Sequence, residues 1–163
     1  MIKGAKFDST GNYRYLLWRC WDKSLPALGF IMLNPSTADA NKDDPTIKKC
    51  MAIAQQHHYG SLWVGNLFAY CSPKPTILKS FAQPVGPQND RFLLSLCRKA
   101  DRIICAWGND GTLQSRTLQK RDQAVTNLLK SHNYQLYCLG KTKGGQPKHP
   151  NPRKPAILKI QPY

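Results

Sequence analysis

The stretch Ala27–Leu33, ALGFIML, sets the fold class of this chain of 163 residues. It is a continuous apolar run, which is typical of a strand that is buried on both faces of a sheet. Similar runs recur along the chain, and a β-rich aromatic stretch precedes the first of them. The other segments that we expect to be strands are Tyr13–Trp21, Ser61–Phe68, Arg102–Trp107, Tyr134–Leu139 and the short Ala156–Ile160.

Helical patterns lie between these strands. Asp44 is a favourable N-cap residue and Pro45 suits the first helical position, so we expect a helix that begins here and ends at Gly60. We expect two further helices, one over Asn89–Lys99 and one over about Thr112–Ser131. A Pro-rich loop is expected over Cys71–Pro87. Buried strands that alternate with helices imply an α/β fold, a three-layer α/β/α sandwich with a mainly parallel central sheet, in one domain over residues 1–163.

The charge of the chain indicates a polyanionic partner. Lysine and arginine total 24 against nine acidic residues, which gives a formal net charge of +15 at pH 7. Such a surplus raises the rate of encounter with nucleic acid and stabilises its binding. The basic residues do not line one face of an amphipathic helix, so a membrane surface is the weaker alternative. We therefore expect a monomer that binds nucleic acid and no membrane.

Three sequence features indicate the cellular compartment and whether a metal or cofactor is bound. They are the apolar runs, the cysteines and the histidines. No run of 18 apolar residues exists, and residues 1–10 lack the apolar core of a signal peptide, so we expect a cytoplasmic protein. None of the six cysteines forms a CxxC pair, and the adjacent His57 and His58 would point in different directions on a helix. We expect no disulfide framework, no metal site and no cofactor.

Polar side chains follow the expected strands at the point where each strand ends. Asn34–Asp39 follows the first apolar run, and Asn66 interrupts the second. Trp107–Gly111 ends the third run, and Lys141–Lys154, which contains His149, follows the fourth. Each segment alone is also explained as a turn, because Asn, Pro and Gly are ordinary turn residues. Ligands of open α/β sheets bind beyond the carboxyl ends of the strands, so together these segments predict one site.

The order of these motifs resembles that of the uracil-DNA glycosylase superfamily, in particular its single-strand-selective and mismatch-specific branches. The matching motifs are Met32-Leu33-Asn34-Pro35-Ser36, Gly65-Asn66-Leu67 and His149-Pro150-Asn151-Pro152-Arg153, within a likeness over about residues 27–155. The pattern LNPSTAD…DDPTI…NLFA…HP resembles more closely a bacterial and phage domain family of unassigned function. The resemblance implies a uracil-DNA glycosylase-like fold and excision of a modified or damaged base from DNA.

The resemblance also implies roles for single residues. Asn34 would position the attacking water, and His149 would donate a hydrogen bond to the oxyanion that develops on the leaving base. Asn66 would bind the edge of the base, because an amide offers both a donor and an acceptor. The candidates for general-base help are Asp39, Asp43 and Asp44. For Asp44, the role of helix cap is the alternative.

The remaining candidates would hold the substrate. Pro35 and Ser36 would line the base pocket, and Phe68 or Trp107 could stack on the base. The basic residues around the last motif would contact phosphates, which positions a nucleic acid without reading its sequence. These residues are Lys141, Lys143, Lys148, Lys154 and Arg153, of which Arg153 is expected to be the foremost contact.

Three departures from the superfamily pattern keep other functions open. Leu33 and Ser36 stand where the superfamily has glycines, and Asn151 stands where it has serine. A pocket altered in this way need not accept uracil. Two alternatives therefore remain: a non-catalytic nucleic-acid-binding protein that reads modified bases, and an enzyme that acts on free nucleotides.

Overall fold

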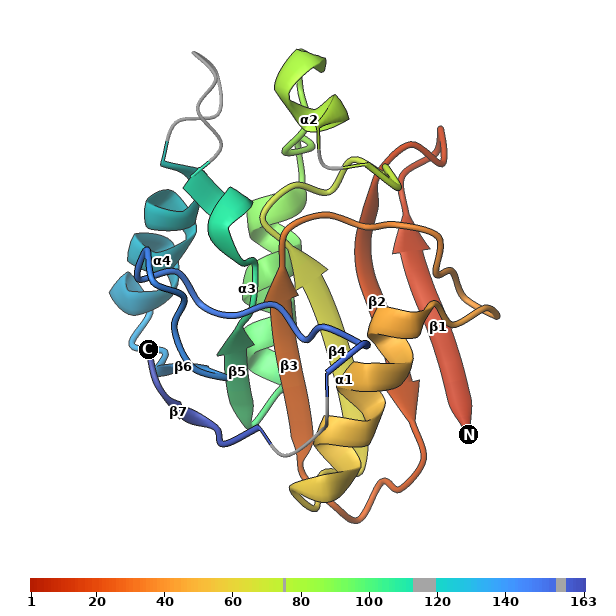
Figure 1. Ribbon diagram of the computed structural model, residues 1–163. Helices are drawn as coiled ribbons and strands as arrows, with labels where there is room; N and C mark the ends of the chain where they lie inside the picture. Colours follow the sequence, from red (N-terminus) through yellow and green to blue (C-terminus); the bar gives the residue numbers. More distant parts are fainter. Residues whose placement is uncertain (75, 113–119, 155–157) are drawn as a thin grey trace.

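The computed structural model describes residues 1–74, 76–112, 120–154 and 158–163. Its centre is a seven-stranded sheet of order β1-β2-β4-β3-β5-β6-β7 (Figure 1). The strands are β1 (Ile2–Phe7), β2 (Arg14–Cys20), β3 (Ala27–Met32), β4 (Ser61–Asn66), β5 (Arg102–Cys105), β6 (Leu136–Cys138) and β7 (Gln161–Pro162). The run ALGFIML thus forms the central strand β3, with all six of its strand residues buried.

The sheet is mixed, which corrects the expectation of a mainly parallel one. Strands β4, β3, β5 and β6 are parallel neighbours, as the apolar runs predicted. Strands β1, β2 and β7 pair antiparallel with their neighbours. The sequence did not predict β1, because its residues are largely exposed at the sheet edge. Of the expected strand Ala156–Ile160, residues 156 and 157 lie outside the described part, residues 158–160 are not in a strand, and the observed strand is Gln161–Pro162.

Helices cover both faces of this sheet. Helix α1 (Pro45–Gln56) packs on one face and buries Ile47, Cys50 and Ile53 against β3 and β4. Helices α3 (Asn89–Lys99) and α4 (Arg121–Ser131) cover the opposite face (Figure 1). The close approach of α3 depends on Gly65, because a Cβ there would lie 2.7 Å from Leu93 Cδ2.

The helix expected from about Thr112 begins later. Residues 109–112 form a 3₁₀ turn, residues 113–119 lie outside the described part, and α4 begins at Arg121. The Pro-rich loop contains one short helix, α2 (Ile77–Ser80). None of the helices in the described residues is both long and apolar enough to span a membrane.

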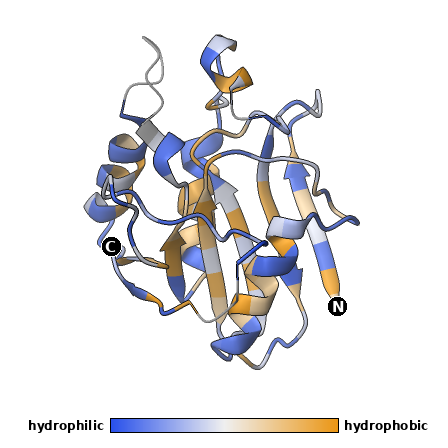
Figure 2. Cartoon of the chain, in the orientation of Figure 1, coloured by the Kyte–Doolittle hydropathy of each residue, from blue (hydrophilic) through white to orange (hydrophobic). Residues whose placement is uncertain are grey.

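Hydropathy follows these layers. The central strands contain mostly hydrophobic residues, and hydrophilic residues are frequent in the surrounding helices and loops (Figure 2). All six cysteines are free, and four of them are buried in the two core clusters or beside them. Burial raises the pKa of the Cys50 and Cys105 thiols far above the ordinary range, so both stay protonated and serve as apolar packing groups.

Candidate functional site

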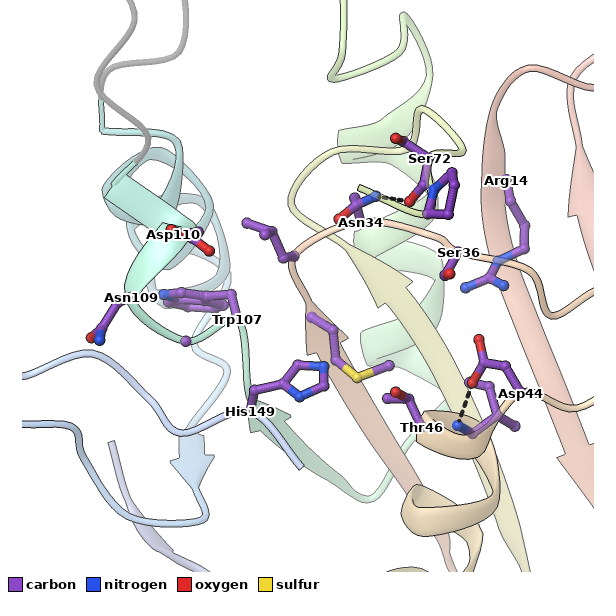
Figure 3. A pocket seen from close by; sticks show the side chains of 15 residues that line it. Arg14, Asn34, Ser36, Asp44, Thr46, Ser72, Trp107, Asn109, Asp110 and His149 are labelled. Carbon is purple, nitrogen blue, oxygen red and sulfur yellow. Dashed lines mark hydrogen bonds between the residues drawn. The ribbon is translucent and has the colours of Figure 1, made fainter. Parts of the chain in front are cut away.

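A pocket of about 450 Å³ lies at the carboxyl ends of β3 and β5. Its walls come from the segment after β3, the start of α1, the turn after β5 and the loop 140–154 (Figure 3). The lining residues are Arg14, Met32, Leu33, Asn34, Ser36, Asp44, Thr46, Ile47, Ser72, Pro73, Trp107, Gly108, Asn109, Asp110 and His149. The polar strand ends that the sequence singled out after β3, after β5 and in the loop 140–154 therefore do meet in one place.

The Asn34 amide is held in one orientation. Its Nδ2 donates to the carbonyl oxygens of Pro35, at 2.9 Å, and Ser72, at 2.8 Å. Two carbonyl acceptors require the NH₂ group on that side, which fixes Oδ1 on the other side of the amide. Oδ1 accepts no hydrogen bond from the described residues, so it remains available to a water or ligand. Pro35 is buried and contributes this carbonyl without lining the pocket, whereas the exposed Ser36 does line it.

His149 reaches the pocket on a small hairpin. Lys148 N–H donates to Gly140 O, Lys141 bridges to Pro147, and Gly108 N–H donates to Pro147 O at 2.8 Å. These bonds tie the hairpin to the turn after β5. The imidazole itself makes no hydrogen bond with the described residues.

The protonation state of His149 follows from its surroundings. Its side chain faces the open pocket, yet the protein around it removes enough water to lower its pKa, an effect that Asp44 partly opposes. The imidazole is therefore neutral at pH 7 and can donate from one ring nitrogen.

Each of the three candidate general bases has a carboxylate that already accepts hydrogen bonds or forms an ion pair within the protein. Asp39 is exposed outside the pocket, and its carboxylate accepts from the backbone of Asn41 and Lys42, which lowers its pKa. Asp43 pairs with Arg19 at 2.6 Å. Neither carboxylate lines the pocket, so the structure does not support a general-base role for them there. Asp44 lines it and is also the N-cap of α1, with Oδ1 accepting from Ile47 N at 2.8 Å.

The two candidate stacking residues belong to the core. Phe68 is fully buried in the core and does not line the pocket, so the structure does not support its expected role as a base platform. Trp107 lines the pocket but is only 2% exposed, with its Nε1 donating to Gln146 Oε1 at 2.9 Å and Tyr163 packed edge-on. Trp107 therefore shapes the wall and does not offer an open ring face.

Asn66 is not among the residues that line the pocket, so its expected contact with a base edge stays a prediction. It is 1% exposed at the end of β4, where its Oδ1 accepts from Arg14 Nη2 at 3.5 Å. Its Nδ2 has no partner among the described residues. Asn66 can therefore influence a ligand through Arg14.

Arg14 is the pocket residue that sequence reasoning missed. It begins β2, which runs antiparallel to β4, so this first residue lies beside the carboxyl end of β4. A search restricted to the carboxyl ends of parallel strands passes over it. The available signal was a charged residue inside the aromatic stretch YRYLLW, because a buried charge needs a reason to be there.

Charge is segregated between this pocket and the surface beside it. The pocket lining contains one of the 24 basic residues, Arg14, and two of the nine acidic ones, Asp44 and Asp110. The predicted phosphate-contact residues Lys141, Lys143, Lys148, Arg153 and Lys154 are all exposed. Lys148 and Lys154 line a second hollow that shares Gly108, Asn109 and His149 with the pocket. Within the described residues, no group of three His, Cys, Asp or Glu side chains is placed to hold a metal ion.

Comparison with known proteins identifies a family. Residues 14–151 match the family described as "Protein of unknown function (DUF1643)", so the chain belongs to this family. No curated protein and no solved structure matches the chain.

Proposed function

For this member of the DUF1643 family, we propose a hydrolase that excises a modified or damaged base from DNA, a monofunctional DNA glycosylase or a close relative. The observation that carries the proposal is the pocket with the open amide oxygen of Asn34 and the neutral imidazole of His149 (Figure 3). The helices on both faces of the sheet and the three ordered motifs are consistent with a fold like that of the uracil-DNA glycosylase superfamily.

In the proposed reaction, a water oxygen forms a bond to C1′ of the sugar while the bond from C1′ to the base nitrogen breaks. The bonding pair leaves with the base, which departs as an anion and takes a proton from solvent. The water loses a proton to solvent, so atoms and charge balance. Asn34 Oδ1 accepts a hydrogen bond from the water and orients it. His149 donates to the carbonyl oxygen of the base, where the negative charge develops.

The distribution of charge supports a polynucleotide substrate. When a base has been turned out of the strand into a pocket, its flanking phosphates stay outside, where basic side chains can contact them. The pocket and the exposed residues of the loop 140–154 have this arrangement. A free nucleotide whose phosphate entered the pocket itself would face Asp44 and Asp110, whereas Lys148 and Lys154 line the adjoining hollow.

The decisive experiment is release of a base. Purified protein is incubated with oligonucleotides that carry uracil, 5-hydroxymethyluracil or other modified bases and with hypermodified phage DNA, and the small-molecule fraction is analysed by mass spectrometry. We expect one base to be released. His149→Ala should slow the release by about 100-fold or more, since the loss of one oxyanion donor costs this much in other enzymes.

Two further variants make this experiment specific. His149→Gln, which keeps a neutral donor, should retain part of the activity, and His132→Ala, at an exposed histidine outside the pocket, should retain all of it. Release that persists in His149→Ala would contradict the proposed role of His149.

A non-catalytic reader of modified bases is the second candidate. The observation that favours it is the engagement of the carboxylates, because Asp39 and Asp43 are outside the pocket and Asp44 caps a helix. No carboxylate is then dedicated to activating the water. Tight binding that weakens steeply with salt, without base release, would support the reader and contradict the glycosylase.

A further inference from the structure

Arg14 is a buried cation that forms no ion pair with the carboxylates of the described residues. The residue is 2% exposed, and no carboxylate of the described residues lies within 4 Å of its guanidinium nitrogens. Nη1 donates to Ala38 O at 2.7 Å and Nη2 donates to Asn66 Oδ1 at the long distance of 3.5 Å, while Nε has no partner among the described residues. Most of its five N–H donors are thus unused, and burial lowers its pKa to about 10. A group held at this cost is expected to have a ligand.

Asp44 faces the same pocket with an open acceptor. Its Oδ1 is used by the backbone of Ile47, but Oδ2 accepts no hydrogen bond from the described residues. Figure 3 shows the Asp44 carboxylate below the Arg14 guanidinium, with Ser36 beside them. The two groups line one pocket and yet form no ion pair. Their anchors explain the separation, because the helix cap holds Asp44 and Ala38 O holds Arg14.

A donor and an acceptor held apart in this way fit a neutral ligand edge better than an anion. A phosphate placed against Arg14 would also face the Asp44 carboxylate. A ligand edge with a carbonyl oxygen beside an N–H satisfies both groups, because the oxygen accepts from Arg14 and the N–H donates to Asp44. The carbonyl oxygen has two lone pairs and can accept from two unused N–H groups of Arg14. The ring nitrogen of cytosine or adenine has only one lone pair.

We propose that Arg14 and Asp44 select the substrate base by binding a lactam edge, –C(=O)–N(H)–, as found in uracil-type pyrimidines and in guanine-type or hypoxanthine-type purines. This inference rests on the proposed function, because it assumes that a base enters the pocket. It assigns the recognition that the sequence had placed on Asn66 to Arg14. Asn66 becomes a positioning residue that accepts from the Arg14 guanidinium.

The test measures binding of the full chain to single-stranded oligonucleotides that differ in one central base. The pairs are uracil against 3-methyluracil and hypoxanthine against 1-methylhypoxanthine, in which one methyl group removes the N–H. The His149→Ala variant is used, because its slowed base release lets binding be measured before turnover. We expect each methylated base to bind about tenfold or more weakly, since a hydrogen bond to a charged group is lost and Asp44 is left unpaired. Equal binding of both members of each pair would overturn the proposal.

Three substitutions assign the effect to the two residues. Arg14→Met should remove the difference in affinity between each base and its methylated partner. Asp44→Asn should reduce this discrimination, and the variant keeps the helix cap because asparagine caps as well as aspartate. Asp110→Asn is the matched control, a pocket carboxylate outside the Arg14 pair, and should preserve the discrimination. Discrimination that survives both Arg14→Met and Asp44→Asn would also overturn the proposal. If Arg14→Met does not fold, Asp44→Asn alone decides.

A second set of measurements distinguishes a free nucleoside from an oligonucleotide as the ligand. It also tests the lactam-edge proposal separately from the glycosylase proposal. Uridine against 3-methyluridine tests a free nucleoside, and discrimination there supports the edge contact with a free ligand as its source. Discrimination without base release would retain the lactam edge and contradict the glycosylase. Base release without discrimination would retain the glycosylase and contradict the lactam edge.

Discussion

Two arginines of one strand, Arg14 and Arg19 of β2, are both buried and yet have opposite surroundings. Arg19 is 0% exposed, pairs with Asp43 at 2.6 Å, and donates to the carbonyl oxygens of Gly4, Trp18, Asp39 and Lys42. Arg14 has no ion pair among the described residues and an unpartnered Nε. Arg19 lies outside the pocket and Arg14 lines it.

The difference separates a structural charge from a binding charge. Arg19 satisfies its donors within the fold and ties the loop before α1 to the sheet, so its burial is compensated by the protein itself. Arg14 remains largely uncompensated, so its burial is explained by a molecule that the pocket receives. The same contrast divides their acidic neighbours, because Asp43 pairs with an arginine and Asp44 keeps one oxygen open to the pocket.

The largest expected difference concerns stability. Arg19→Met should lower the free energy of unfolding by about 3 kcal/mol, because it leaves Asp43 and several carbonyl groups without their buried donor. Arg14→Met should lower the free energy of unfolding by about 1 kcal/mol at most, because the loss of its hydrogen bonds to Ala38 O and Asn66 Oδ1 is offset by the removal of a desolvated cation. Urea denaturation of both variants measures the difference. Equal destabilisation would break the distinction between the two arginines.

The adjacent aspartates provide a second, smaller contrast. Asp43→Asn should destabilise the protein by about 2 kcal/mol, because it removes the charge partner of the fully buried Arg19. Asp44→Asn should cost no more than about 0.5 kcal/mol, since asparagine satisfies the same N-cap contact. Thermal or urea unfolding of the two variants provides the measurement. A larger loss for Asp44→Asn would mean that Asp44 stabilises Arg14 within the fold and is not held for a ligand.

Salt dependence distinguishes the role of Arg14 from that of the exposed lysines. Lys148→Gln should reduce the slope of log affinity against log salt by about one phosphate contact. Arg14→Met should weaken binding of a uracil-containing oligonucleotide and leave the slope unchanged, because a base contact releases no counterions. Fluorescence anisotropy over a range of salt concentrations tests both statements. A reduced slope in Arg14→Met would assign Arg14 to a phosphate.

The smallest effect concerns the titration of His149. Burial lowers its pKa and Asp44 partly restores it, so Asp44→Asn should lower the pKa further, whereas Asp43→Asn should leave it unchanged. The pKa of His149 is lower in the folded protein than in the unfolded chain. Protonation of His149 therefore lowers the free energy of unfolding only as the pH falls from about 6.5 through the pKa of the folded state. Base release that needs neutral His149 should therefore persist below pH 6.5. NMR titration of the imidazole checks the pKa, and an ordinary value would contradict it.

Local signals explain which parts of the structure the sequence could predict. The apolar runs gave the parallel strands, and Asp44-Pro45 gave the start of α1, because burial and capping depend on neighbouring residues. The pairing of β2 with β4 and the edge strand β1 depend on register between distant segments, so the mixed sheet was not predicted. The same long-range register brings the Arg14 guanidinium to Asn66 Oδ1, so the sequence pattern did not indicate Arg14 as a pocket residue.

The measurement that tests the central claim most directly is a two-dimensional ¹⁵N spectrum of the arginine side chains during titration with oligonucleotides. The Nε–H resonances of Arg14 and Arg19 report both arginines in one sample. The account predicts that the Arg14 resonance shifts with a uracil-containing strand, shifts much less with the 3-methyluracil strand, and that the Arg19 resonance stays in place. An Arg14 resonance that does not move, or that moves equally with both strands, would contradict the assignment of this pocket to a base.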